Sequence, residues 1–289
     1  MGLTRILRTA KVTVTHSFYA DEGKADVDSG NVTATLKRLT GTTVESVTAG
    51  HSGLGDYTYP VPAQALLDTF RLEWSGLFGG VTVTQVDYVE VVGGFLFGIA
   101  EARHRHQFLR DVARYPTADL AAKRIEVEQE IENICGQAWV PRFARYALSG
   151  RGYEQLGTPV TMLRTLRAAS IAGVALTQPE LDQVSLTDSG ILRRPTGVPW
   201  PAGYRNVIVE VEHGNDYPPD PIKEAGILRL RSRMSSTTTE IPDRAISFAP
   251  AEGGTYRIST PSRQRTGIPD VDGVLERPGW TRRPRAAVA

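Results

Sequence analysis

Residues 204–234 read YRNVIVEVEHGNDYPPDPIKEAGILRLRSRM, and the change of pattern within this stretch indicates the fold class. In its first part a valine recurs at every second position, which predicts a half-buried strand over Asn206–Glu212. A proline-rich break follows, and the basic segment from Ile222 to Met234 then predicts a helix. A strand and a helix separated by a sharp break indicate an α+β protein.

Residues 1–98 show the two-residue period of strands, with frequent turn signals between the alternating runs. Glycines in segments such as Gly53-Leu54-Gly55 supply the positive-φ positions that tight turns need. About seven short strands in this length predict a small β-sandwich of the immunoglobulin-like type, without the cysteine pair of antibody domains. The predicted strands include Val12–Thr15, Val32–Leu36, Tyr57–Tyr59, Phe70–Trp74 and Val81–Thr84.

From Ile99 the pattern changes to a helical period. Ala100–Arg114 predicts a charged helix that ends before Pro116. A second helix is predicted from Thr117 to Cys135, because Thr117 is a favourable N-cap and Gly136 favours the turn after a helix. Its apolar stripe consists of Leu120, Val127, Ile131, Ile134 and Ala138, whereas Glu126, Glu128, Glu130 and Glu132 predict a solvated or interface face.

The remainder of the chain predicts β-hairpins, one more helix and a long arm. Residues 141–214 are typical of irregular β structure, with a strand or hairpin over Val160–Leu176 that turns at Gly173. Together with the two helices, this predicts a mainly helical domain with β-hairpin insertions over residues 99–235. Residues 236–289 lose all period and are rich in proline and arginine, so we expect an extended arm that is mobile in the free subunit.

The overall net charge of +1 conceals an uneven distribution along the chain. From Ile222 onward there are twelve Lys and Arg residues against seven Asp and Glu residues, a balance of +5, and the rest of the chain has a balance of −4. This asymmetry favours head-to-tail packing of copies over nucleic-acid recognition, because the basic part contains few aromatic residues and no dense run of cations.

Bulk properties predict a soluble protein of a reducing compartment. No stretch approaches the roughly 18 consecutive apolar residues of a membrane span, and the first residues lack the apolar core of a signal peptide. The single cysteine, Cys135, excludes an internal disulfide. We expect synthesis in the cytoplasm and no membrane partner.

No motif for metal, cofactor or catalytic chemistry emerges. His104 and His106 are two residues apart, which on a helix directs them to different faces. The acidic run from Asp26 to Gly30 has Lys37 where a calcium loop requires its last glutamate, so a turn is the better interpretation. Phosphate-binding and dinucleotide-binding loops are absent from the sequence. We therefore expect no cofactor, no metal and no enzymatic activity.

Several ordered segments between Phe108 and Trp280 resemble the head–tail connector (adaptor) proteins of tailed double-stranded DNA bacteriophages. None of these segments carries a required chemistry, and it is their order along the chain that carries the resemblance. They are Ile134–Arg142, Gly190–Arg194, Trp200–Val207, Glu212–Gly214, Ile241–Ala245 and Gly267–Asp272. The predicted β-sandwich lies outside the resemblance as an appended domain.

The resemblance implies a structural protein of the virion neck. It implies a homo-oligomeric ring, of about twelve copies, that lies below the portal protein and receives a stopper or head-completion protein and then the tail. Genomic double-stranded DNA would pass through the lumen without sequence specificity. For a portal or subunit interface we select residues of the basic helix and the arm, namely Arg229, Arg231, Arg233, Arg244, Ile268, Val271, Leu275 and Trp280.

A second function remains open at this stage. The predicted sandwich could bind a carbohydrate or receptor at the virion surface, in which case the aromatic residues Tyr57, Tyr59 and Trp74 would be the candidate contacts. The alternating pattern places at least Trp74 in the core.

Overall fold

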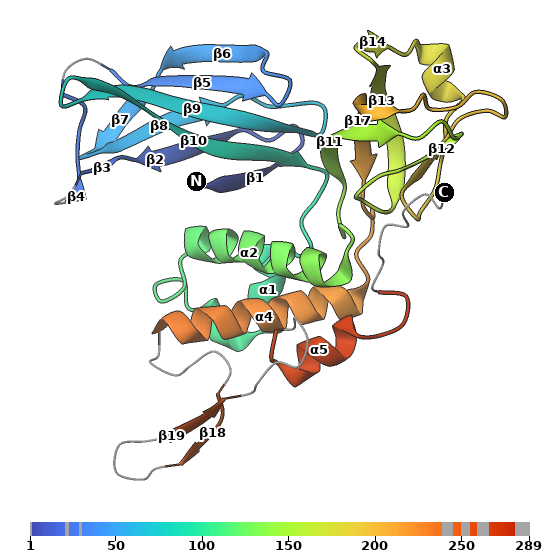
Figure 1. Cartoon of the computed structure of the whole chain (residues 1–289). Coiled ribbons are helices and arrows are strands. Elements are labelled where there is room, and N and C mark those ends of the chain that lie inside the picture. Colours follow the sequence, from blue (N-terminus) through green and yellow to red (C-terminus); the bar gives the residue numbers. More distant parts are fainter. Residues whose placement is uncertain are drawn as a thin grey trace. The chain divides into compact units, whose positions relative to one another are not determined.

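A computed structural model describes residues 2–20, 23–28, 31–238, 245–249, 255–258 and 266–280 (Figure 1). The chain is a mixed α+β protein, as the sequence predicts. It divides into two compact units. The first consists of Met1–Gly94 with Pro141–Tyr146 and Glu210–Glu212, and the second of Phe95–Val140, Ala147–Val209 and His213–Ala289.

The first unit is built from strands. A five-stranded sheet has the order β1-β10-β9-β5-β6, with β1 parallel to β10 and the other pairs antiparallel, and a three-stranded sheet has the order β2-β8-β7. The short strands β3 and β4 form a separate ribbon. The strands are β1 (Leu3–Leu7), β2 (Val12–Ser17), β3 (Tyr19–Ala20), β4 (Gly23–Lys24), β5 (Thr33–Arg38), β6 (Thr43–Thr48), β7 (Gly50–Gly53), β8 (Asp56–Val61), β9 (Asp68–Phe78) and β10 (Val81–Val92).

Both sheets of the first unit contribute to one buried cluster. Phe70, Leu72 and Trp74 alternate with more exposed residues on β9, and Tyr57 and Tyr59 do so on β8. Since side chains of a strand point alternately to its two faces, one face of each sheet supplies this core. All five strands predicted in this region are present, and each extends beyond its predicted last residue, although β5 begins at Thr33 rather than at Val32.

The helices of the second unit are α1 (Ile99–Arg105), a 3₁₀ turn η1 (Gln107–Arg110), α2 (Thr117–Cys135), α4 (Asp220–Thr238) and α5 (Pro269–Leu275). The bounds of α2 are those predicted, with Gly136 left-handed at φ 68° after its end. The predicted N-cap is wrong, because Pro116 occupies that position and Thr117 is the first helical residue. The predicted helix Ala100–Arg114 is wrong over its second half. His106 is extended, and this break allows both Leu109 and Tyr115 to reach the core.

The second unit also contains two small sheets and a short helix. A four-stranded sheet has the order β11-β17-β13-β14, and a three-stranded sheet has the order β12-β16-β15. The predicted hairpin is present, with Ala172 and Gly173 both at positive φ. The elements are β11 (Arg142–Gly150), β12 (Gln155–Gly157), β13 (Leu163–Ile171), β14 (Val174–Ala175), α3 (Gln178–Asp182), β15 (Ser185–Leu186), β16 (Ile191–Arg193) and β17 (Gly203–His213), of which β11 and β17 contribute residues to both units.

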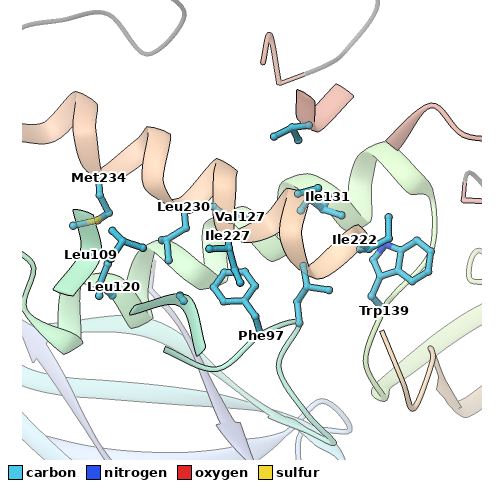
Figure 2. Close-up of a cluster of buried hydrophobic side chains, with 14 of the residues drawn as sticks. Phe97, Leu109, Leu120, Val127, Ile131, Trp139, Ile222, Ile227, Leu230 and Met234 are labelled. Carbon is cyan, nitrogen blue, oxygen red and sulfur yellow. The ribbon is translucent and has the colours of Figure 1, made fainter. Parts of the chain in front are cut away.

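A single hydrophobic core joins the helices of the second unit (Figure 2). Val127 and Ile131 of α2 lie against Ile227 and Leu230 of α4, and all four are buried. Gly226 of α4 packs on Leu96 and Phe97, where a Cβ would come within 2.9 Å of each side chain. The absence of a side chain at this position therefore allows the segment before α1 to approach α4 closely.

The region predicted as an extended arm contains regular structure. Helix α4 continues to Thr238, β18 (Ala245–Ala249) pairs with β19 (Thr255–Ile258), and α5 follows. Val271 and Leu275 of α5 belong to the helical core. Within residues 266–280, the chain is therefore packed against its own helices.

Candidate functional site

Three of the arginines selected from the sequence lie on α4, and the structure gives them different environments. Arg229 is 3% exposed and binds Glu130 of α2 through two hydrogen bonds, Nε to Oε2 at 2.8 Å and Nη2 to Oε1 at 3.0 Å. Arg233 binds Glu126 at 2.8 Å and Glu130 at 3.1 Å. These two arginines therefore join α4 to α2 within the subunit.

The Glu130 carboxylate of α2 is held in the ionised form. Burial opposes ionisation of Glu130, but the Arg229 hydrogen bonds and the charges of Arg229 and Arg233 outweigh it and lower the pKa of Glu130 below its ordinary value. Glu128, predicted on the same solvated face, is instead buried and accepts the Leu96 N–H at 2.7 Å. Of the four glutamates predicted on this face, Glu128 is therefore internal and Glu130 is largely covered by α4, whereas the Glu126 side chain remains 43% exposed.

Arg231 is the exposed member of the three. Its guanidinium carbon lies 6.0 Å from the centre of the Phe108 ring, and Arg114 lies 5.8 Å from the same ring. Among the residues that the structure describes, no carboxylate is within ion-pair distance of Arg231. This side chain is available to a partner, whereas Arg229 and Arg233 are committed to α2.

The four apolar candidates of the arm all contact the helical core. Val271 and Leu275 are fully buried, and Ile268 and Trp280 are partly buried against the same cluster. The Trp280 ring meets the Trp139 ring edge-on at 5.5 Å, and its carbonyl accepts the Gln137 side-chain amide at 2.9 Å. The remaining candidate, Arg244, lies outside the described residues.

Sequence reasoning missed a buried polar cluster in the first unit. Asp87 accepts hydrogen bonds from the Gly2 N–H at 2.7 Å and the Trp74 Nε1–H at 3.1 Å, and it lies 2.6 Å from the His16 Nδ1. The other ring nitrogen of His16 lies 2.7 Å from the Gln85 side-chain oxygen. With both ring nitrogens occupied, His16 has no site left to bind a substrate, and the cluster is structural.

Asp87→Asn tests this cluster. Burial opposes ionisation of Asp87, but the His16 and Gly2 hydrogen bonds outweigh it and lower its pKa. The stability from this carboxylate is then present above its unfolded pKa of about 3.9 and is lost as pH falls through the lower folded value. We expect Asp87→Asn to cost about 1–3 kcal/mol at pH 7 and less at pH 3, measured as amide hydrogen exchange of β9 and β10.

The matched control is Asp28→Asn, which removes a charge from an exposed carboxylate of the same unit that, among the described residues, accepts only the Gly80 N–H at 2.8 Å. Its cost should stay within about 0.5 kcal/mol. An Asp87 effect of equal size at both pH values would contradict the assignment.

Across the described residues, no group of His, Cys, Asp and Glu side chains is arranged to hold a metal ion. His106 lies 3.3 Å from Glu224, and His104 is exposed. Cys135 is fully buried, and burial raises the pKa of its thiol to about 11. Within the same residues, no helix is both long enough and apolar enough to span a bilayer.

The chain has similar solved structures, although the sequence comparisons found no match. No family model matches the chain, and no curated protein matches it. A chain from the neck of an empty gene transfer agent (GTA) particle, computed with C6 symmetry, is 18% identical, with a TM-score of 0.43 over 67% of this chain and 93% of that one. A chain from the virion of a native GTA particle is 16% identical, with a TM-score of 0.41 over the same shares.

Proposed function

We propose that this chain is a structural protein of a phage-like virion neck, forming a ring below the portal that connects the DNA-filled head to the stopper and tail. The observation that carries the proposal is the ordered series of connector-like segments between residues 108 and 280. Three of these segments, Ile134–Arg142, Trp200–Val207 and Glu212–Gly214, have scaffolding roles in the structure that support the proposal.

The segment Ile134–Arg142 forms the end of α2 and the start of β11. Gly136 ends the helix in a left-handed conformation, and its N–H donates to the Glu132 carbonyl at 2.8 Å. Trp139 then enters the helical core. Both features serve folding: the left-handed glycine ends the helix, and the buried indole fills the core. Neither is a catalytic or ligand-binding group.

The segment Trp200–Val207 shapes the start of β17. Trp200 is fully buried with its Nε1–H directed to the Leu192 carbonyl at 3.4 Å. The Asn206 side chain accepts the Gly150 N–H at 2.9 Å and donates to the Pro201 carbonyl at 2.8 Å. A single amide therefore fixes the end of β11 to the loop before β17.

The segment Glu212–Gly214 requires glycine at its end. Gly214 has φ 102°, its N–H donates to the Met162 carbonyl at 2.9 Å, and a Cβ there would collide with the Val140 carbonyl. Close backbone packing of this kind suits a protein that must present rigid surfaces to many neighbours.

By extension from the resemblance, the proposed partners are the portal protein, a stopper protein, about eleven further copies of this chain, and double-stranded DNA held without sequence specificity. Residues 1–98 are proposed to be an appended immunoglobulin-like sandwich. We do not favour a carbohydrate-binding role for it through the aromatic residues selected from the sequence, because Tyr57, Tyr59 and Trp74 are all buried.

The test is loss of this chain from a cell that produces the particle. Without it, we expect DNA-filled heads that carry no tails, and expression of the full chain should restore tailed particles. A cryo-EM map of restored particles should then place the chain between portal and tail. Normal tailed particles in its absence would refute the proposal.

A further inference from the structure

Two tyrosines flank the same strand and are far more exposed than their neighbours. Tyr204, near the start of β17, and Tyr217, beyond its end, are each 86% exposed, more than any other large apolar or aromatic side chain in the described part of the chain. Rings left in water forgo the stabilisation that burial of apolar surface would give. Tyrosine is enriched in the centres of protein interfaces, so both positions indicate contact surfaces.

The start of β17 carries a basic surface, which we define as Arg151, Tyr153, Tyr204 and Arg205. All four side chains are exposed. Over the described residues, no carboxylate lies within ion-pair distance of Arg151 or Arg205. These cations contrast with Arg229 and Arg233, which are neutralised within the subunit, and their charge is free to meet an acidic partner.

This basic surface is held rigidly by its backbone. Gly152 donates to the Trp200 carbonyl at 2.9 Å, and Trp200 donates back to the Tyr153 carbonyl at 2.8 Å. Arg205 has φ 48°, a conformation that non-glycine residues seldom adopt, and its N–H donates to the Ser149 hydroxyl at 3.0 Å. Tyr204 and Arg205 are therefore presented by a strained, fixed stretch of backbone at the start of β17, which reduces the entropy lost on binding.

The end of β17 leads to an acidic surface, which we define as Asp216, Tyr217 and Asp220. The Asp216 side chain is 51% exposed but pairs with Arg164 at 2.6 Å within the subunit, so Asp220 supplies the less neutralised charge of this surface. Asp220 is 78% exposed, and its nearest cations, Lys223 and Arg105, lie at 3.5 Å and 3.9 Å. Pro218 and Pro219 stiffen the loop that carries Tyr217.

We propose that the basic surface of one copy docks on the acidic surface of the next copy, with Tyr204 and Tyr217 buried in the contact. This inference rests on the proposed ring. The two surfaces differ in charge and lie at opposite ends of an 11-residue strand, about 35 Å apart at the usual rise per residue. A contact between two different patches is head-to-tail, and repetition of it closes a ring when the rotation between copies allows.

Disulfide trapping tests the contact in the full chain. Tyr204→Cys and Tyr217→Cys each introduce one exposed thiol, and the native Cys135 is buried and contributes little background. Under mild oxidation with copper–phenanthroline, a mixture of the two variants should form disulfide dimers at least about five times faster than either variant alone. The double variant should form a ladder of covalent oligomers.

Tyr19→Cys paired with Tyr217→Cys is the matched control, because Tyr19 is 67% exposed but belongs to neither surface. Adding Arg151→Glu to the double variant should reduce the ladder several-fold, whereas adding Arg8→Glu, an exposed arginine of the first unit that belongs to neither surface, should not. Trapping no faster than the Tyr19 control overturns the proposal, as does trapping of Tyr204→Cys with itself at the rate of the mixture.

The remaining alternative is that the basic surface binds nucleic acid, and adding excess duplex DNA to the trapping reaction tests it. An unchanged ladder is expected, and a ladder abolished by DNA would mean that the basic surface binds nucleic acid instead, which also overturns the proposal. None of these failures touches the proposed function, because tail attachment in particles is measured independently of which surfaces join the copies.

Discussion

Arg229→Ala is expected to lower the free energy of unfolding of the helical part by about 2–4 kcal/mol. Arg229 is almost completely buried, and its removal leaves Glu130, whose side chain is only 20% exposed, with one of its two cations. Breaking a buried pair by removing one partner typically costs about 3–5 kcal/mol, and we reduce this range because Glu130 retains Arg233 and some contact with water.

The matched control is Arg231→Ala, two residues further along the same helix. Arg231 is exposed, lies over the Phe108 ring and has no carboxylate partner among the described residues, so its replacement should cost at most about 0.5–1 kcal/mol. Urea unfolding followed by circular dichroism in the helical band measures both, since α2 and α4 supply most of the helical residues. Equal costs for the two variants would show that the α2–α4 ion pairs contribute nothing net.

Leu275→Ala is expected to cost about 2–5 kcal/mol, a surprising value for a residue near the end of a non-periodic, proline-rich segment. The physical reason is that Leu275 is 2% exposed within the helical core, so its truncation removes buried methyl groups and leaves a cavity. The same urea unfolding experiment applies.

Gly273→Ala provides the control on the same short helix. A Cβ at Gly273 would meet nothing within 4 Å, so the substitution adds helix propensity without disturbing any packing. We expect it to be neutral or to stabilise the protein by up to about 1 kcal/mol. If Leu275→Ala is as harmless as Gly273→Ala, α5 is detached in the free subunit, and the mobile arm expected from the sequence describes the chain better.

Several interface candidates also have structural roles inside the subunit, which affects how they can be tested. A combined replacement of Arg229, Arg231 and Arg233 would weaken the α2–α4 contact together with any assembly contact, so loss of association would have two explanations. Replacing Arg231 alone tests the assembly contact without weakening the α2–α4 contact, because Arg231 is exposed and has no carboxylate partner in the described residues. The buried apolar candidates Val271 and Leu275 have the same ambiguity, since their present contacts are internal.

Local features of this protein could be predicted from its sequence with good accuracy. The alternation on β9, the bounds of α2 from Thr117 to Cys135, and the turn at Gly173 were all readable in advance. Each depends on neighbours within a few residues: the period of the apolar side chains, a residue that favours a helix end, or a glycine that accepts positive φ.

Other features depend on which distant segments meet, and only the tertiary structure decided them. The helix after Ile99 breaks at His106 because Leu109 and Tyr115 must both reach the core. Arg229 is internal and Arg231 external because α2 covers one side of α4, and α5 is ordered because its apolar residues find that same core. Composition and period are properties of one segment and can be found in its sequence. Burial and ion pairing depend on which other segments lie next to it in space, and the pattern of one segment does not contain that information.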